Sequence, residues 1–260
     1  MTQEAENHRA KYRGHAEAFK DRSVVEAYRY RPPYPAETFD ILTGLINGEP
    51  RRVLDVGCGR GDIARNLVER VERVDAVDFS QAMIEQGKRL PNGDHPHLRW
   101  LYGRIEEVPL EPPYALITAG RSLHWLDWRI VMPRFRAALS EGGYLAMVTD
   151  QTTPDAWSML DDITRRYRTD TYSRLADDET RHLFHRVGEK ITQPMQLVQS
   201  IDDYIESYHS RSGFSRERMG QERAAAFDQE ARAFLQQSYS DGMITLQVRG
   251  HVVWGVPQWR

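Results

Sequence analysis

The stretch Arg52-Val53-Leu54-Asp55-Val56-Gly57-Cys58-Gly59-Arg60-Gly61 joins a short apolar run to three closely spaced glycines. Apolar residues follow at Ile63, Leu67 and Val71, a spacing typical of one helix face. A strand, a glycine loop and a helix in this order predict an α/β unit. Because glycine lets the backbone approach a ligand closely, and a helix N-terminus presents free N–H groups, we expect this loop to bind a cofactor.

Further apolar runs alternate with helical patterns on both sides of this stretch. We expect strands at 74–79, 98–103, 114–119 and 144–149, with helices that begin after Ser80 and Asp127. Later in the chain we expect a strand at 195–199, helices at 202–209 and 221–237, and a long strand at 244–254. The predicted fold is therefore α/β: a seven-stranded, Rossmann-like, mostly parallel sheet flanked by helices, with an antiparallel C-terminal strand and a helical lid or insertion.

The chain divides into four predicted parts. Residues 1–50 form an N-terminal cap segment, and residues 51–150 form the cofactor-binding core. Residues 151–190 are polar, rich in arginine and helical in tendency, so we interpret them as a lid or insertion beside the site. Residues 191–260 complete the sheet. The segment from Tyr12 to Phe19 is expected to close over the cofactor and exclude water.

Composition predicts an ordinary globular protein of the cytoplasm and disfavours large nucleic-acid substrates. Hydrophobic residues make up 40% of the chain, and the formal net charge is −3, which does not favour nucleic acid. No run approaches the roughly 20 apolar residues that span a bilayer, and the first 20 residues lack an apolar signal-peptide core. The single cysteine, Cys58, fits a reducing compartment. We therefore expect neither a membrane nor nucleic acid as a partner, and the sequence leaves the oligomeric state open.

The spacing of the glycines separates two kinds of cofactor. A dinucleotide fingerprint has glycines at the first, third and sixth positions, but the sixth position from Gly57 is Asp62, and the third glycine is Gly61. Asp55 puts a carboxylate beside the loop, which would repel phosphates and attract an ammonium or sulfonium group. Asp78 ends the second strand, where a carboxylate can accept hydrogen bonds from both ribose hydroxyls. The pattern favours a cofactor without a pyrophosphate.

These segments resemble a known enzyme family. Residues 53–61 look like motif I of the class I S-adenosylmethionine-dependent methyltransferases, and 77–80 resemble motif II. Residues 103–109 are similar to the adenine-contacting loop, and 118–125 and 28–35 resemble segments of the type 11 subgroup that includes trans-aconitate methyltransferases. Arg104 departs from the pattern, because many relatives carry an acidic residue near this position that accepts from adenine, and an arginine cannot accept.

The resemblance and the residues together predict a set of cofactor contacts. S-adenosyl-L-methionine is the expected cofactor, with Phe79 against the adenine face and Ile105 or Glu106 at the adenine amino group. Aromatic rings of the segment around Tyr28 are expected near the sulfonium. The full predicted cofactor set is Tyr28, Arg31, Asp55, Gly57, Cys58, Gly59, Asp78, Phe79, Met83, Ile105, Glu106, Ala119 and Ser122.

The catalytic and acceptor residues are harder to predict. His124 follows the fourth strand and is either a general base or a wall of the cofactor site, and Tyr172 is a second catalytic candidate. Arg31 or Arg211 is expected to bind an acceptor carboxylate, and His209 and Trp254 are further acceptor candidates. His182 and His185 lie three apart on a predicted helix without a matching carboxylate or cysteine, so no metal site is expected.

The predicted function is methyl transfer to a small-molecule acceptor by in-line displacement at the sulfonium. One alternative keeps the cofactor but cyclises it internally, with release of methylthioadenosine. A third class, an NAD-type oxidoreductase or a non-catalytic binding protein on a similar fold, fits the glycine spacing less well.

Overall fold

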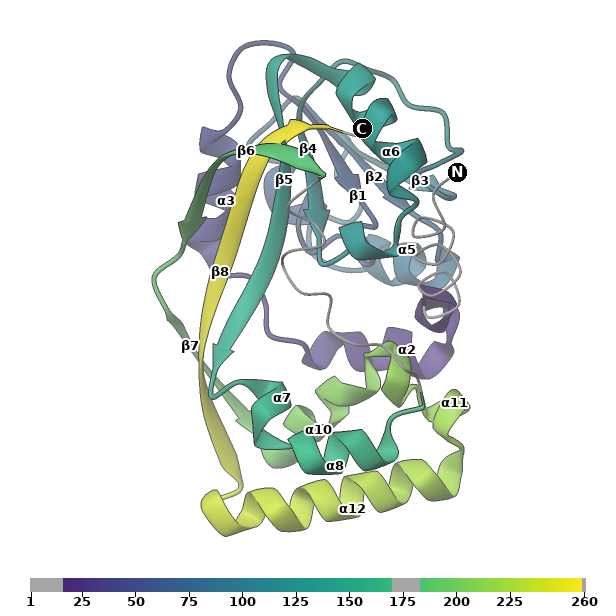
Figure 1. Ribbon diagram of the computed structural model, residues 1–260, viewed down its shortest axis with the longest axis vertical. Coiled ribbons are helices and arrows are strands. Elements are labelled where there is room, and N and C mark those ends of the chain that lie inside the picture. The colour runs from purple at the N-terminus through teal and green to yellow at the C-terminus, as the bar shows by residue number, and fades with distance from the viewer. Residues whose placement is uncertain (1–15, 170–182, 259–260) are drawn as a thin grey trace.

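The glycine loop lies at the centre of a mixed sheet. A computed structural model describes residues 16–169 and 183–258. The predicted unit around the loop forms β1 (Arg52–Val56) and α4 (Ala64–Leu67). Four further strands run parallel to β1: β2 (Arg73–Asp78), β3 (Leu98–Tyr102), β4 (Tyr114–Gly120) and β5 (Leu139–Thr153). The carboxyl ends of these strands point toward the helices in the lower part of Figure 1.

The strand order places a ligand-binding edge next to the loop. The order is β3-β2-β1-β4-β5-β8-β6, and it reverses direction between β1 and β4. Ligands bind outside the carboxyl ends of the strands at such a reversal. Asp55 of β1 is in register with Thr118 of β4, so the residues that follow both strands meet at this edge. The sheet thus brings the glycine loop beside the segment 121–125.

Helices cover both faces of the sheet because the strand side chains alternate. Along β1, Val53 packs into the core under α3 (Ala36–Gly44) and α4. Leu54 and Val56 pack into the opposite core, against α6 (Trp128–Ala138). α5 (Gln81–Lys88) begins at Ser80, whose side chain accepts a hydrogen bond from the Met83 N–H, as expected for a helix cap. This layering confirms the predicted α/β fold.

A second core forms where β5 and β8 extend beyond the other strands (Figure 1). β8 (Met243–Pro257) is antiparallel to β5, and its first half packs on the helices of the C-terminal part. Those helices are α7 (Ala156–Met159), α8 (Asp161–Tyr167), α10 (Ile201–His209), α11 (Arg216–Met219) and α12 (Gln221–Ser238). Short 3-10 turns lie at η1 (Glu17–Lys20), η2 (Tyr28–Tyr30), η3 (Leu123–Trp125) and η4 (Ser212–Phe214).

One strand was not predicted. The described residues form eight strands rather than seven, because β6 (Phe184–Ile191) pairs with β8 inside the segment expected to be helical. β7 (Met195–Ser200), which was predicted, pairs with the other half of β8. β6 is an edge strand whose side chains are mostly exposed, so it lacks the apolar run that marks a buried strand. His185 therefore lies on a strand rather than on the predicted helix.

The N-terminal segment joins the sheet to the helical part. α2 (Arg22–Ala27) packs Val24 and Val25 against Met83 of α5. On its other side, the Ser23 N–H donates to Glu217 of α11 over 2.9 Å. The Ser80 hydroxyl donates to the Phe19 carbonyl over 2.8 Å. Residues 16–31 therefore lie along the sheet edge where the glycine loop opens.

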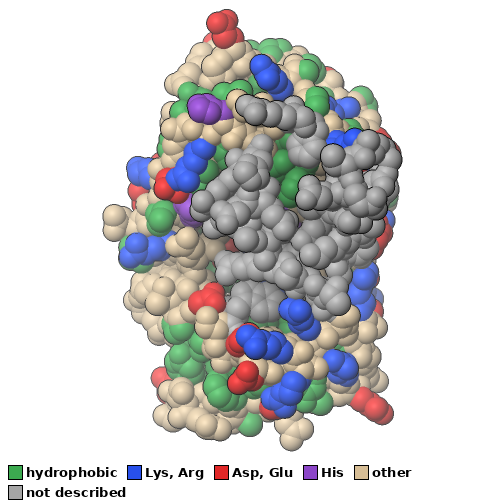
Figure 2. Space-filling view, viewed as in Figure 1, with side chains coloured by type: hydrophobic (Ala, Val, Ile, Leu, Met, Phe, Trp, Pro, Cys, Tyr) green, Lys and Arg blue, Asp and Glu red, His purple; other side chains and the backbone are tan. Residues whose placement is uncertain are grey.

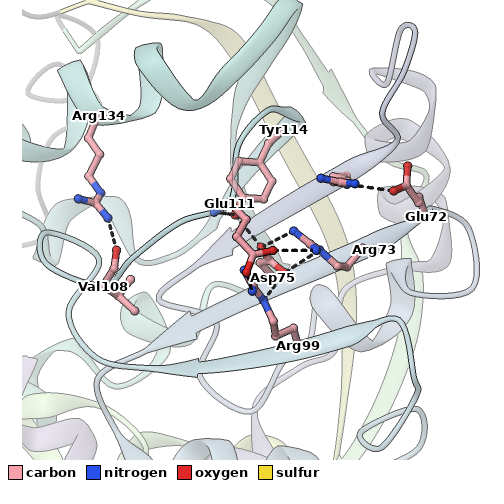
Figure 3. Close-up of polar contacts among 9 residues, drawn as sticks. Glu72, Arg73, Asp75, Arg99, Val108, Glu111, Tyr114 and Arg134 are labelled. Atoms are coloured by element: carbon pink, nitrogen blue, oxygen red, sulfur yellow. Dashed lines mark hydrogen bonds and ion pairs between the residues drawn. The ribbon is translucent and has the colours of Figure 1, made fainter.

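An ion-pair network ties β2 to β3 away from the glycine loop (Figure 3). Asp75, fully buried in the middle of β2, pairs with Arg99 over 2.7 Å and with Arg73 over 3.1 Å. The hydroxyl of the buried Tyr114 donates to the same carboxylate over 2.6 Å, and Glu111 pairs with both arginines. A buried carboxylate is tolerated only when it is paired and hydrogen-bonded, and this one is. The network stabilises the sheet.

Exposed arginines of the helical part form ion pairs with acidic side chains. On the face in Figure 2, basic side chains over the lower helices lie among acidic ones. Arg165 pairs with Asp161 over 2.5 Å, and Arg166 pairs with Glu230. In the described ranges no helix is long and apolar enough to cross a bilayer. The same residues contain no group of three metal-ligating side chains.

Candidate functional site

The glycine loop turns sharply between β1 and α4. Gly57 and Gly59 have φ angles of +62° and +55°, in the left-handed region that favours glycine. A Cβ on Gly57 would lie 2.5 Å from the Cβ of Ser122, so this glycine lets the two loops touch. A Cβ on Gly59 would meet nothing within 4 Å. The backbone at Gly59 therefore faces open space, as a cradle for a ligand requires.

Asp78 binds the loop from the end of β2. Its carboxylate accepts from the Gly59 N–H over 2.7 Å and from the Ser80 N–H over 2.7 Å. Burial raises the pKa of this carboxyl to about 6, although the two N–H groups work in the opposite direction. Each carboxylate oxygen keeps a second lone pair for another donor. The predicted pair of Gly59 and Asp78 is therefore brought together.

The Asp55 carboxylate forms its hydrogen bonds inside the protein. It is 1% exposed, and its two oxygens accept from the Ala64 N–H over 3.1 Å and from the Thr118 hydroxyl over 2.8 Å. Burial raises its pKa to about 7, with smaller opposing effects from these two hydrogen bonds. The carboxylate thus ties the start of α4 to β4 and holds both ends of the glycine loop in place.

Cys58, which follows Gly57 in the glycine loop, is half-buried at the same edge of the sheet. Its backbone N–H donates to Val77 over 3.0 Å, and burial, followed by the charges of Asp78 and Asp55, raises the pKa of its thiol. Ser122 is buried and donates to the Val56 carbonyl.

Phe79 lies between two cations. Lys20 and Arg104 are 5.2 Å and 5.1 Å from the centre of its ring, and Arg104 also donates to Glu17 over 2.6 Å. Glu106, the expected adenine contact, accepts from the Asp127 N–H at the start of α6 over 2.9 Å. Three further residues of the predicted cofactor set are buried in packed hydrophobic clusters: Met83, Ile105 and Ala119.

Tyr28 and Arg31 connect the loop to the helical part. The Arg31 guanidinium lies 4.2 Å from the centre of the Tyr28 ring, and that ring also lies 5.7 Å from the Arg60 guanidinium of the glycine loop. Arg31 donates to the Ser210 hydroxyl over 2.7 Å and to the Ser210 carbonyl over 2.6 Å. The aromatic-cationic segment predicted before the sheet therefore lies beside the glycine loop.

The loop after β4 carries His124. Its ring lies 4.3 Å from the Trp125 ring, and the Trp125 ring is 5.6 Å from Phe19 in an edge-to-face contact. His124 is half-buried and belongs to the loop that touches Gly57. Its two predicted roles, base and wall, both fit this position. Tyr172 lies outside the described residues.

Two residues that were predicted to contact the methyl acceptor, His209 and Trp254, lie elsewhere in the fold. His209 is fully buried, and its ring nitrogens face the Phe214 carbonyl and the Asp228 carboxylate, each at 2.7 Å. This residue holds the helical core, so its proposal as an acceptor contact was wrong. Trp254 packs against Gly188, where a Cβ would lie 2.4 Å from the indole ring. That contact places it in the sheet between β8 and β6.

Sequence reasoning missed two residues of the edge, Arg121 and Asp150, while Tyr34 belongs to the predicted aromatic segment around Tyr28. Arg121 pairs with Asp150 over 2.9 Å and donates to the Tyr34 hydroxyl over 3.2 Å. It is a non-glycine residue with a φ of +52°, a strained conformation that is often found at functional sites. Its position directly after the fourth predicted strand was the available signal.

The comparisons with known proteins agree with this geometry. The methyltransferase domain family matches residues 53–143. An uncharacterised methyltransferase of Mycobacterium tuberculosis is 35% identical over 128 residues, which are 48% of this chain and 50% of that protein. A trans-aconitate 2-methyltransferase of Pseudomonas paraeruginosa is 30% identical over 114 residues, 43% of this chain and 40% of that protein. The matches therefore span about half of these curated relatives or less.

The fold comparison extends over more of the chain. A solved structure from Anaeromyxobacter dehalogenans, described as a type II methyltransferase, superimposes with a TM-score of 0.67 at 23% identity. The superposition covers 88% of this chain and 99% of that structure, and at this identity it shows the fold alone. Residues 53–143 thus match a methyltransferase domain family, and the chain shares its fold with a solved methyltransferase structure.

Proposed function

We propose that this protein transfers the methyl group of S-adenosylmethionine to a small-molecule acceptor. The observation that carries the proposal is the bond from the Gly59 N–H to the Asp78 carboxylate, at the open end of the glycine loop. It places a buried carboxylate beside backbone that faces open space. A ribose diol needs an acceptor of this kind, and a pyrophosphate would be repelled by it.

The residues around the loop fit the cofactor. Gly59 leaves room for close approach, and the Asp78 oxygens keep lone pairs for two hydroxyl donors. Phe79 follows Asp78 directly and offers an aromatic face, which Lys20 and Arg104 flank as cations. S-adenosylmethionine supplies a sulfonium-bound methyl group that an acceptor atom displaces in line.

The tasks left to the chain are binding, orientation and exclusion of water. Correct placement of two reacting groups contributes about 7–11 kcal/mol to such a reaction. Phe19 and Trp125 pack edge to face across the loop after β4, which shields the site on that side. His124 in the same loop is the base that we assign when the acceptor must lose a proton, and Tyr172 remains a second prediction.

Two measurements test the proposal. Calorimetry should show binding of S-adenosylmethionine and none of NAD, because the glycine spacing and Asp78 disfavour a pyrophosphate. Incubation with candidate acceptors should then yield S-adenosylhomocysteine. Release of methylthioadenosine in its place would refute methyl transfer and identify the cyclisation reaction. The small-molecule acceptor, expected from the resemblance, and the cytoplasmic location, expected from composition, remain predictions.

A further inference from the structure

The turn η1 brings a carboxylate to the loop that follows β3. Glu17, the first residue of η1, accepts from the Arg104 guanidinium over 2.6 Å and pairs with Lys20 over 2.7 Å. Arg104 itself only donates hydrogen bonds, so a ligand that offers an N–H group finds no acceptor on this side chain. The ion pair puts a carboxylate beside it, from a segment 87 positions earlier in the chain.

This ion pair lies next to the aromatic ring of Phe79. The two cations that bind Glu17 also flank this ring, with Lys20 5.2 Å and Arg104 5.1 Å from its centre. In the proposed binding mode the Asp78 carboxylate accepts from the ribose hydroxyls, and one bond joins the ribose to its base. Because Phe79 follows Asp78 directly, the base belongs on the side of the site where these charged groups gather.

Further contacts hold η1 at the edge of the sheet. The Ser80 hydroxyl donates to the Phe19 carbonyl over 2.8 Å, and the Ser80 N–H donates to Asp78 over 2.7 Å. The Phe19 ring packs edge to face on Trp125, in the loop after β4. The turn is therefore bound to the segments that follow three neighbouring strands, β2, β3 and β4. Such anchoring fixes the Glu17 carboxylate before a ligand arrives, which lowers the entropic cost of binding.

The Glu17 carboxylate can accept one more hydrogen bond. Burial acts to raise its pKa, but the hydrogen bonds and charges of Lys20 and Arg104 outweigh burial and hold the pKa below its ordinary value. One oxygen faces Arg104 and the other faces Lys20, and each carboxylate oxygen has two lone pairs. Glu106, the carboxylate predicted for the adenine contact, holds the start of α6 through the Asp127 N–H. Glu17 can therefore accept from a neutral N–H group while it keeps both ion pairs.

We propose that Glu17 selects adenine as the base of the cofactor, by accepting a hydrogen bond from its exocyclic amino group. The inference rests on the proposed function, because it takes S-adenosylmethionine as the cofactor, and it assigns the residue that recognises the base. A purine with a carbonyl oxygen at the same position would place two acceptors against each other, which is costly in a partly buried site. Lys20 and Arg104 are positioning residues that hold the carboxylate.

The test is calorimetry on the full chain with two ligands, S-adenosylhomocysteine and S-inosylhomocysteine, whose hypoxanthine base carries a carbonyl oxygen in place of the amino group. We expect the wild-type protein to bind the adenine compound more tightly by about tenfold or more. Glu17→Gln should bring the two affinities within about threefold of each other, because an amide offers both a donor and an acceptor. Lys20→Met breaks one ion pair and leaves the carboxylate, so it should weaken both compounds and keep the preference for adenine.

The matched control is Glu26→Gln. Glu26 forms an exposed ion pair with Arg22 in α2, and this variant should keep the wild-type preference. A Glu17→Gln protein that still prefers adenine, or that loses both compounds, would give Glu17 a structural role and overturn the inference. Equal binding of the two compounds to the wild type would overturn it as well, and both results leave the cofactor assignment in place. Failure of the wild type to bind either compound would instead reject the cofactor of the proposed function, and the inference with it.

Discussion

Replacing Asp55 by asparagine should stabilise the protein above neutral pH. The carboxyl is buried, accepts from the Ala64 N–H and the Thr118 hydroxyl, and has a pKa of about 7. An asparagine keeps both contacts, because its carbonyl accepts from Ala64 and its amide donates to the Thr118 oxygen. Asp55→Asn therefore removes a buried charge without removing a bond.

The magnitude follows from the pKa of Asp55. Its rise from 3.8 to about 7 is about three pH units, and at about 1.4 kcal/mol for each unit the ionised form costs the folded state about 4 kcal/mol. Because the folded pKa is raised, this cost is absent below pH 4, grows as the pH rises and is complete above pH 7. The advantage of Asp55→Asn should thus widen by about 2.5 kcal/mol between pH 5 and pH 8.

Urea unfolding of both proteins at pH 5, 6, 7 and 8 measures the difference. The exposed Asp94 supplies a matched control, since Asp94→Asn should leave the free energy of unfolding unchanged at each pH. An Asp55→Asn protein that is less stable than wild type at pH 8, or a difference that stays constant with pH, would contradict the reasoning.

Three further predictions follow from single contacts. Asp78→Asn should weaken S-adenosylmethionine binding by about 10–100-fold in calorimetry, and wild-type affinity should fall below pH 6, because the protonated carboxyl accepts less well. Gly57→Ala should cost about 1–3 kcal/mol in urea unfolding, and Gly48→Ala, with positive φ but open space, should cost less. Tyr114→Phe should cost about 1–3 kcal/mol by loss of the bond to Asp75, without changing cofactor affinity; a tenfold change in affinity would contradict the assigned structural role.

Much of the candidate cofactor site could be predicted because the residues that indicate it lie close together in the sequence. The glycine loop is a run of neighbouring residues, and Asp78 follows at the end of the next strand. Parallel strands that alternate with helices bring those two ends to the same edge of the sheet without further information. Placing Gly59 and Asp78 on one cofactor site needed only the order of elements and their lengths, and the bond between them is a finding of the structure.

The edge strand and the helical core were not predictable in the same way. β6 carries mostly exposed side chains, so its pairing with β8 leaves no apolar pattern in the sequence. His209 looked like a polar residue near the end of a helix, and only the packing of η4 and α12 around it buries the ring. For β6 and for His209, the structure depends on the distant segment that packs against them and not on a pattern in the local sequence.

The sequence by itself determined the strand, the glycine loop and the acidic partner, and with them the class of cofactor, because these depend on spacing over a few residues. The tertiary structure alone decided which charges meet. Arg31 and its partner Ser210 are 179 positions apart, and Arg121, directly after β4, donates to Tyr34, which lies 87 positions earlier. No periodicity links residues at such separations. Their meeting depends on how the N-terminal segment and the C-terminal helices pack against the sheet edge.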